Sequence, residues 1–239
     1  MVRWIGGRSD AVVAVSSAVA AKHSGGGAPI LRTIPDGIDL ARFSPLPARR
    51  EPGPMVFAFV GRMSSEKGPD LFVEAARLLL RRNREAVFLL CGEPPVAGRS
   101  AADDRVLSLM TEEGPSGRIR HVGFQQDMAL FLEKVDVVVV PSRREGLGIA
   151  AVEALARGKP VIARRVGGLP EVVSHGEVGL LVDGDDPSDL ADAMESLLTD
   201  RVLFERMSAA APAKASSFSR DEMVRSIEQI YRQARNSSL

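Results

Sequence analysis

The sequence has little of what marks a nucleic-acid-binding, membrane or secreted protein. Lys plus Arg and Asp plus Glu both number 31, so the formal net charge is zero and no broad positive field can hold a nucleic acid. No uninterrupted apolar run approaches the roughly 18 residues of a membrane helix, which argues against a membrane span and leaves peripheral attachment open. The single cysteine, Cys91, lies in an apolar run and cannot form an internal disulfide. We expect it in the core of a cytoplasmic protein.

The beginning of the sequence allows two interpretations. Arg3 and Arg8 precede residues 11–21, which loosely resemble a signal peptide with small residues near its end. The segment is rich in Ala and Ser rather than Leu, however. Residues 12–15 followed by Ser16 are equally typical of a strand that leads into a helix cap, and we favour this interpretation.

Short aliphatic runs alternate with segments of helical periodicity through most of the 239 residues. This alternation predicts an α/β fold with a Rossmann-like, doubly wound parallel sheet and helices on both faces. Strands are expected at residues 12–15, 30–34, 56–60, 87–91, 119–122, 137–140, 161–163 and 179–182. Helices are expected at residues 67–82, 103–113, 128–135, 149–157, 187–199 and 201–211.

Residues 44–54 contain four prolines and read as a linker, because proline cannot donate to a sheet ladder. We therefore expect the end of another domain and a crossover in residues 1–44, the sheet domain in 45–217, and a terminal helix in 218–239. Apolar residues of that helix recur at helical spacing and predict an apolar stripe. They are Met223, Ile227, Ile230, Tyr231 and Ala234.

Two loops that follow predicted strands carry candidate site residues, and doubly wound sheets bind ligands beyond the carboxyl ends of their strands. After Val140, glycines precede a helix, whose backbone N–H groups and dipole suit a diphosphate. Glu145 and Glu153 bracket this turn, and carboxylates repel phosphate but accept hydrogen bonds from sugar hydroxyls. A nucleotide sugar has both groups. The alternative is an ordinary loop acid and an exposed helix residue.

After Val60, Arg62 and Lys67 flank a turn at the start of an expected helix, where the helix dipole disfavours a cation. If both converge on a diphosphate, they neutralise its charge as a metal would and stabilise a departing nucleoside diphosphate. The alternative is a pair of surface cations.

These motifs resemble the carboxyl-terminal, donor-binding domain of retaining glycosyltransferases with the GT-B architecture, of the family 4 type. The resemblance covers about residues 10–235. Its landmarks are residues 34–39 (Ile-Pro-Asp-Gly-Ile-Asp), 61–68, 122–124 (Val-Gly-Phe), 138–148, 153–158, 160–163, 167–171 (Gly-Gly-Leu-Pro-Glu) and 176–182.

The resemblance implies glycosyl transfer from a nucleoside diphosphate sugar with retained configuration, without a required metal or other cofactor. Arg62 and Lys67 match the pair that holds the diphosphate, Glu145 the residue that faces the sugar hydroxyls, and Glu153 the residue that holds the ribose. The backbone of Gly146, Leu147 and Gly148 would contact sugar and phosphate, Gly61 belongs to the phosphate turn, and Gly123 and Phe124 would border the base. The implied catalytic residues are Arg62, Lys67 and Glu145.

Some features depart from the family pattern. Asp36 stands where asparagine is common, and residues 91–95 lack the usual second glycine, which leaves the nucleotide open. Only residues 10–24 match the acceptor-binding half, and His23, His121 and His175 do not match its histidine. We expect the uncovered part of the terminal apolar stripe to drive association with a separate amino-terminal chain or with a second copy. The donor-binding domain would act with such a partner or as part of a longer parent chain.

Other function classes fit less well. A non-catalytic nucleotide-sugar binding or regulatory protein remains the main alternative. The sequence shows neither the acid and base residues of an epimerase nor the cofactor lysine of a phosphorylase. A dinucleotide oxidoreductase is disfavoured, because Val60 is not followed by the required glycine fingerprint.

Overall fold

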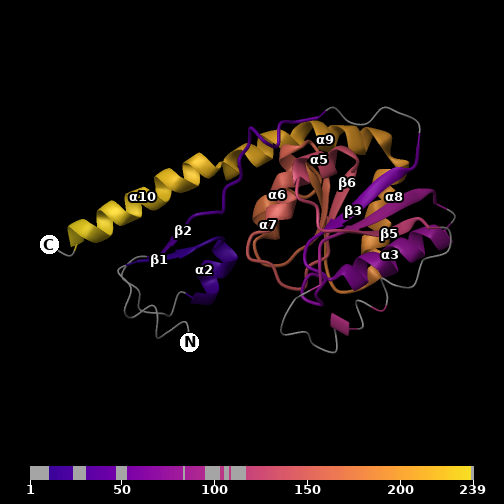
Figure 1. Cartoon of the computed structure of the whole chain (residues 1–239), viewed down its shortest axis with the longest axis horizontal. Coiled ribbons are helices and arrows are strands. Elements are labelled where there is room, and N and C mark those ends of the chain that lie inside the picture. Colours follow the sequence, from indigo (N-terminus) through magenta and orange to yellow (C-terminus); the bar gives the residue numbers. More distant parts are fainter. Residues whose placement is uncertain are drawn as a thin grey trace.

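The computed structural model describes residues 11–23, 31–46, 53–82, 84–94, 103–104, 108 and 117–237. Its centre is a six-stranded parallel sheet in the order β5-β4-β3-β6-β7-β8 (Figure 1). The strands are β3 (Met55–Val60), β4 (Ala86–Cys91), β5 (Ile119–Gly123), β6 (Val137–Val140), β7 (Val161–Arg164) and β8 (Gly179–Val182). The chain reverses its direction of winding at β3, between β4 and β6. This reversal is the point at which such sheets bind ligands.

Both faces of the sheet are buried, which explains why its strands are almost continuously apolar. Side chains alternate between the faces with a period of two residues. Phe57 and Phe59 pack with Val137 and Val139 in one core cluster, whereas Ala58 belongs to the cluster on the other face. Helices must therefore cover both sides.

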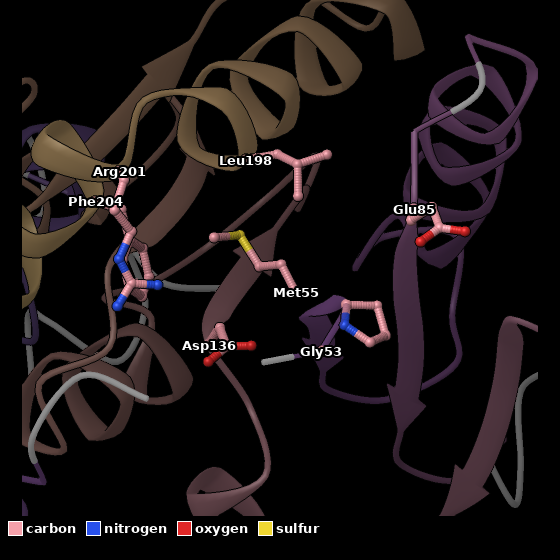
Figure 2. A pocket seen from close by; sticks show the side chains of 8 residues that line it. Gly53, Met55, Glu85, Asp136, Leu198, Arg201 and Phe204 are labelled. Atoms are coloured by element: carbon pink, nitrogen blue, oxygen red, sulfur yellow. The ribbon is translucent and has the colours of Figure 1, made fainter. Parts of the chain in front are cut away.

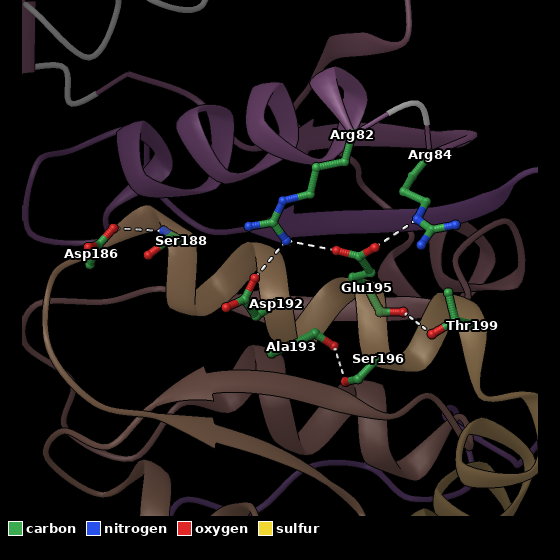
Figure 3. A network of polar contacts seen from close by, with 9 residues as sticks. All are labelled: Arg82, Arg84, Asp186, Ser188, Asp192, Ala193, Glu195, Ser196 and Thr199. Atoms are coloured by element: carbon green, nitrogen blue, oxygen red, sulfur yellow. Dashed lines mark hydrogen bonds and ion pairs between the residues drawn. The ribbon is translucent and has the colours of Figure 1, made fainter.

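One face is covered by α3 (Pro69–Arg81) and α8 (Pro187–Thr199), and the other mainly by α5 (Met128–Glu133) and α6 (Ile149–Ala156). A short helix α7 (Leu169–Val172) and α9 (Arg201–Ala215) also pack in this domain, against α6. Arg82, at the carboxyl end of α3, pairs with Asp192 at 2.6 Å and Glu195 at 2.7 Å on α8 (Figure 3). These exposed ion pairs join the two helices at their surface.

A second, two-stranded parallel sheet lies apart from the first (Figure 1). It consists of β1 (Val12–Ala14) and β2 (Leu31–Thr33), with α2 (Ser17–His23) after β1. The Ser16 hydroxyl accepts a hydrogen bond from the Val19 amide at 3.2 Å, so Ser16 caps α2. The predicted strand and helix cap at this position are thus confirmed.

The carboxyl-terminal helix α10 (Arg220–Ser237) follows a short 3₁₀ turn, Ser216–Phe218, and projects from the main domain toward β1 and β2 (Figure 1). The crossover is fixed against its start, since the Ile38 amide donates to the Phe218 carbonyl and the Arg220 amide to the Ile38 carbonyl, both at 2.9 Å. No helix in the described part of the chain combines the length and apolar character needed to cross a bilayer.

The predicted α/β fold is confirmed, and all eight predicted strands are present within one or two residues of their expected limits. Helix α8 has the expected bounds. The helix expected at 67–82 begins later, at Pro69, because Gly68 adopts a left-handed conformation with φ 72°. Lys67 therefore precedes the helix, contrary to the prediction. Helix α7 was not predicted, and the helix expected at 103–113 lies largely outside the described residues.

Candidate functional site

A cavity of about 330 Å³ opens at the carboxyl ends of β3 and β6. The loop after β3 forms one wall with Gly61 and Lys67, and the loop from β6 to α6 forms another. The residues of this second wall are Val140, Ser142, Glu145, Gly146, Leu147, Gly148, Ile149 and Ala150. Val15 and Asp36, from the segments before the main domain, complete the lining together with Phe59 and Val60.

Lys67 and Glu145 meet in this cavity. The Lys67 ammonium donates to both carboxylate oxygens of Glu145, at 2.9 Å to Oε1 and 2.8 Å to Oε2. Ser142 Oγ donates to Oε2 at 3.1 Å, and the Gly146 amide donates to Oε1 at 3.2 Å. The two charged side chains are only 22% and 12% exposed, so solvent screens their attraction weakly.

The two loops that carry this pair are tied to each other. The amide of Arg143 donates to the Glu66 carbonyl at 2.8 Å. The Arg143 guanidinium donates to both oxygens of Asp70, at 2.9 and 2.7 Å, and to the Ser65 carbonyl at 2.7 Å. Because Arg143 lies on the β6 loop and its partners flank Lys67, these bonds fix the position of Lys67 relative to Glu145.

Glycines allow a third loop, between β7 and α7, to pack directly on the site. A Cβ at Gly167, whose φ is 54°, would collide with the Glu145 carbonyl. A Cβ at Gly168 would lie 2.9 Å from Leu147 Cα and 2.9 Å from Ser16 Cβ. Only glycine permits this close approach, through which the β7–α7 loop packs against the backbone of the β6–α6 loop.

The amino-terminal segment is also fixed to the site. Ser16 Oγ donates to the Gly146 carbonyl at 2.7 Å. Glu171, on α7, accepts hydrogen bonds from the Ser17 and Ala18 amides at 3.2 and 3.3 Å, so an acid from the main domain caps helix α2. These contacts place Val15 at the rim of the cavity.

Glu153 lies on α6, outside the cavity lining. Burial raises the pKa of its carboxyl to about 7, and the positive charge of Arg42 opposes this shift only in part. The carboxylate makes no hydrogen bond to another residue in the described part of the chain. Its charge acts on Cys91, whose thiol pKa is raised to about 11, chiefly by burial. Cys91 is buried, as predicted.

The remaining predicted site residues are more dispersed. Arg62 is exposed, does not line the cavity and makes no ion pair with the residues described around it. Gly123 ends β5 and Phe124 follows it. Strands β4 and β3 lie between β5 and β6, and Phe124 is 68% exposed. The structure thus brings together Gly61, Lys67, Glu145, Gly146, Leu147 and Gly148, and leaves Arg62, Gly123, Phe124 and Glu153 outside this cavity.

Sequence reasoning missed several lining residues. Ser142 stood in a quoted motif but was not assigned a role, although its spacing of three residues from Glu145 suits a local hydrogen bond. Val15 and Asp36 are distant in sequence, and only the packing of the amino-terminal segment brings them to the site. In the described ranges, no group of three or more His, Cys, Asp or Glu side chains is arranged to hold a metal ion.

A second cavity, of about 420 Å³, lies at the opposite edge of the sheet (Figure 2). Its lining includes Met55, Glu85 and Asp136, which stand at or just before the amino ends of β3, β4 and β6. Asp136 has a structural role, since its carboxylate accepts a hydrogen bond from the Val56 amide at 2.8 Å. The amino ends of the strands are not where doubly wound sheets bind ligands, so we assign the site to the first cavity.

The fold and the first cavity define a doubly wound α/β domain with a polar ligand site at the carboxyl edge of its sheet. The family profile "Glycosyl transferases group 1" matches residues 47–214. The chain therefore belongs to the group 1 glycosyl transferases.

Among curated proteins, the chain is 38% identical over 180 residues to a D-inositol 3-phosphate glycosyltransferase of Corynebacterium diphtheriae, covering 74% of this chain and 42% of that protein. It is 40% identical over 197 residues to the protein of the same name from Nocardia farcinica, covering 78% of this chain and 44% of that protein. The chain thus spans about half the length of the curated relatives it matches.

Solved structures show the same fold. HepE of Anabaena in complex with UDP and glucose superposes with a TM-score of 0.83 at 24% identity, covering 95% of this chain and 64% of that chain. Sucrose-phosphate synthase of Thermosynechococcus elongatus gives a TM-score of 0.84 at 28% identity, covering 98% and 61%.

Proposed function

We propose that this chain is the donor-binding half of a retaining glycosyltransferase of the family 4 type, which transfers a sugar from a nucleoside diphosphate sugar. The observation that carries the proposal is the Lys67–Glu145 pair in the cavity at the carboxyl edge of β3 and β6. A cation for the diphosphate and an acid for the sugar hydroxyls are the two groups that such a donor requires at its reactive end. The matched family and the UDP-bound fold relative support it.

Each side chain has a distinct role in the proposed reaction. The bond between the anomeric carbon and the diphosphate oxygen breaks. The acceptor oxygen bonds to that carbon from the same face, and its proton passes to the departing diphosphate oxygen. Negative charge develops on the leaving diphosphate, where Lys67 stabilises it, and Arg62 joins Lys67 by turning its exposed side chain inward. These two cations take the place of a metal. Glu145 orients the sugar, and Glu153 accepts hydrogen bonds from the ribose.

We propose further that the base lies at Gly123 and Phe124, in a domain of residues 45–217. An amino-terminal half would bind the acceptor, supplied by a separate chain or by a longer parent chain, and we also propose that two copies associate through α10. We place the protein in the cytoplasm, because its buried Cys91 is a free thiol.

Calorimetric titration with UDP, GDP and ADP, each alone and with its sugar, tests the site. We expect micromolar to millimolar binding that Glu153→Ala abolishes and that the double variant Arg62→Ala with Lys67→Ala also abolishes. Unchanged affinity in both variants contradicts the assignment. Turnover of donor with candidate acceptors separates the enzyme from a non-catalytic nucleotide-sugar binding protein, which would bind the donor and leave it intact.

A further inference from the structure

The loops after β4 and β5 form a second part of the carboxyl edge, next to the cavity. The strand order β5-β4-β3-β6 places the loops that carry Glu145, Lys67, Glu93 and Phe124 in a row across this edge. The Gly61 amide donates to the Cys91 carbonyl at 3.0 Å and ties the β3 and β4 loops together. A donor with its sugar at Glu145 and its diphosphate at Lys67 would therefore extend its base toward Glu93.

We propose that Glu93 selects the nucleobase of the donor, and that the base it selects is guanine. This inference rests on the proposed function, because it assigns the base to the same bound donor.

Glu93 is held in place although its side chain is exposed. Its backbone carbonyl accepts from the Met63 amide at 3.0 Å, and its carboxylate Oε1 accepts from the Phe124 amide at 3.0 Å. The neighbouring Gly92 amide donates to the Gly123 carbonyl at 3.0 Å. A Cβ at Gly123 would lie 3.4 Å from Oε1, in ordinary contact with it, and glycine is favoured at this position by its φ of 67°. The acid is thus fixed between the two loops.

The 68% exposed ring of Phe124 provides an apolar surface beside this carboxylate. Aromatic side chains stack on any base and therefore do not discriminate among bases. Selection must come from hydrogen bonds to the base edge, and Glu93 is the charged group that the structure fixes next to the ring.

An ionised carboxylate only accepts hydrogen bonds. Guanine presents two adjacent donors, the ring N1–H and the 2-amino group, which match the two oxygens of one carboxylate. Uracil presents a single N3–H between two carbonyl oxygens, and these oxygens would repel the carboxylate oxygens. Adenine and cytosine each place an acceptor nitrogen next to their amino group. Glu93 also occupies the Phe124 amide, a donor that could otherwise pair with a base carbonyl.

The test is calorimetric titration of the whole chain with GDP, UDP and ADP. We expect GDP to bind at least about tenfold more tightly than UDP, the scale of one or two hydrogen bonds to a charged group. Glu93→Gln keeps an oxygen for the Phe124 amide and replaces the other by a donor. This variant should lower the ratio of GDP to UDP affinity by about tenfold or more. Glu177→Gln, an exposed acid before β8, is the matched control and should leave the ratio unchanged.

The outcomes separate the inference from the proposed function. Binding of all three diphosphates with equal affinity, tighter binding of UDP, or an unchanged ratio in Glu93→Gln overturns the role of Glu93 and leaves the donor site intact. Failure of all three to bind overturns the proposed function and the inference with it. The ratio of GDP to UDP affinity in the unaltered chain can by itself contradict the inference, so the test remains even if Glu93→Gln fails to fold.

Discussion

Lys67 and Glu145 neutralise each other's charge, so in the proposed function a bound diphosphate would compete with Glu145 for Lys67. A diphosphate at Lys67 must share the ammonium with the Glu145 carboxylate, which Lys67 contacts at 2.8 and 2.9 Å. The Ser142 hydroxyl and the Gly146 amide donate to the same carboxylate, so it would keep two hydrogen bonds if Lys67 moved to the phosphate. In the proposed function, donor binding would therefore free the Glu145 carboxylate to accept hydrogen bonds from sugar hydroxyls.

The first prediction concerns Glu145→Gln, which removes the anion that competes for Lys67. We expect the variant to bind nucleoside diphosphate several-fold, up to about tenfold, more tightly, because a charge-assisted contact no longer has to be shared. The additional affinity gained from the attached sugar should fall. Titration with the nucleotide alone and with the nucleotide sugar measures both effects. Ser142→Ala removes a hydrogen bond from a neutral donor to the same carboxylate and leaves the competing anion in place, so it is the control. Equal behaviour of the two variants would contradict the competition.

The second prediction follows from the raised pKa of Glu153, from an ordinary 4.5 to about 7. Between these values the folded chain holds the proton more tightly than the unfolded chain. Stability is therefore favoured below pH 4.5 and declines as the pH rises toward 7. For the unaltered chain, the contribution of Glu153 to the free energy of unfolding should fall by on the order of 1–3 kcal/mol between pH 5 and pH 8. Glu153→Gln should remove this decline. Urea unfolding at both pH values measures it, and a variant with the unaltered pH slope would exclude Glu153 as its source.

At the scale of elements, the site depends on how three loops are joined. The β3 and β6 loops are linked by Arg143, and the β7 loop supports them through glycine contacts. None of these links touches the cavity through a functional side chain. They act by fixing the backbone from which Lys67 and Glu145 project.

The third prediction is that Arg143→Met loosens this arrangement. Its guanidinium forms a two-point contact with Asp70 while both side chains are partly buried, at 32% and 20% exposure. We expect a loss of about 1–3 kcal/mol in the free energy of unfolding, because Asp70 is left without its partner. Donor affinity should fall as well. Arg143→Lys, which keeps the charge but not the planar fork, should recover only part of both losses. Full donor affinity in Arg143→Met would show that the loops hold their positions without it.

The elements differ in how well sequence alone predicts them. The strands were predictable because a strand buried on both faces must be apolar throughout, and residues 137–140 are four consecutive valines. The start of α3 was misplaced, since the left-handed turn at Gly68 depends on close packing against the Pro141 carbonyl. Helix α7 was missed because four residues carry too little periodicity. The Lys67–Glu145 contact joins residues 78 positions apart, so the sequence indicated their shared site but not their direct bond.

At the scale of the molecule, α10 extends from the main domain with two faces of different character (Figure 1). The predicted apolar stripe is divided between them. Ile230 is 8% exposed and packs inward, whereas Tyr231 is 74% exposed. Val224, seven residues before Tyr231 and hence on the same side of the helix, is 44% exposed. The outward face therefore presents Tyr231, which belongs to the predicted stripe, together with Val224, which does not.

The fourth prediction is that this outward face of α10 drives self-association. Burying an exposed apolar surface lowers the free energy, and two copies can pack these faces of α10 against each other symmetrically. We expect the mean mass in sedimentation velocity to rise with protein concentration, and the double variant Val224→Ser with Tyr231→Ser to shift this rise to at least several-fold higher concentration. Val202→Ser removes an equally exposed side chain, 76% accessible, from α9 and should leave the mass profile unchanged. A single monomeric species at the highest concentration would refute association through α10, and an equal effect of Val202→Ser would assign it to nonspecific apolar contact.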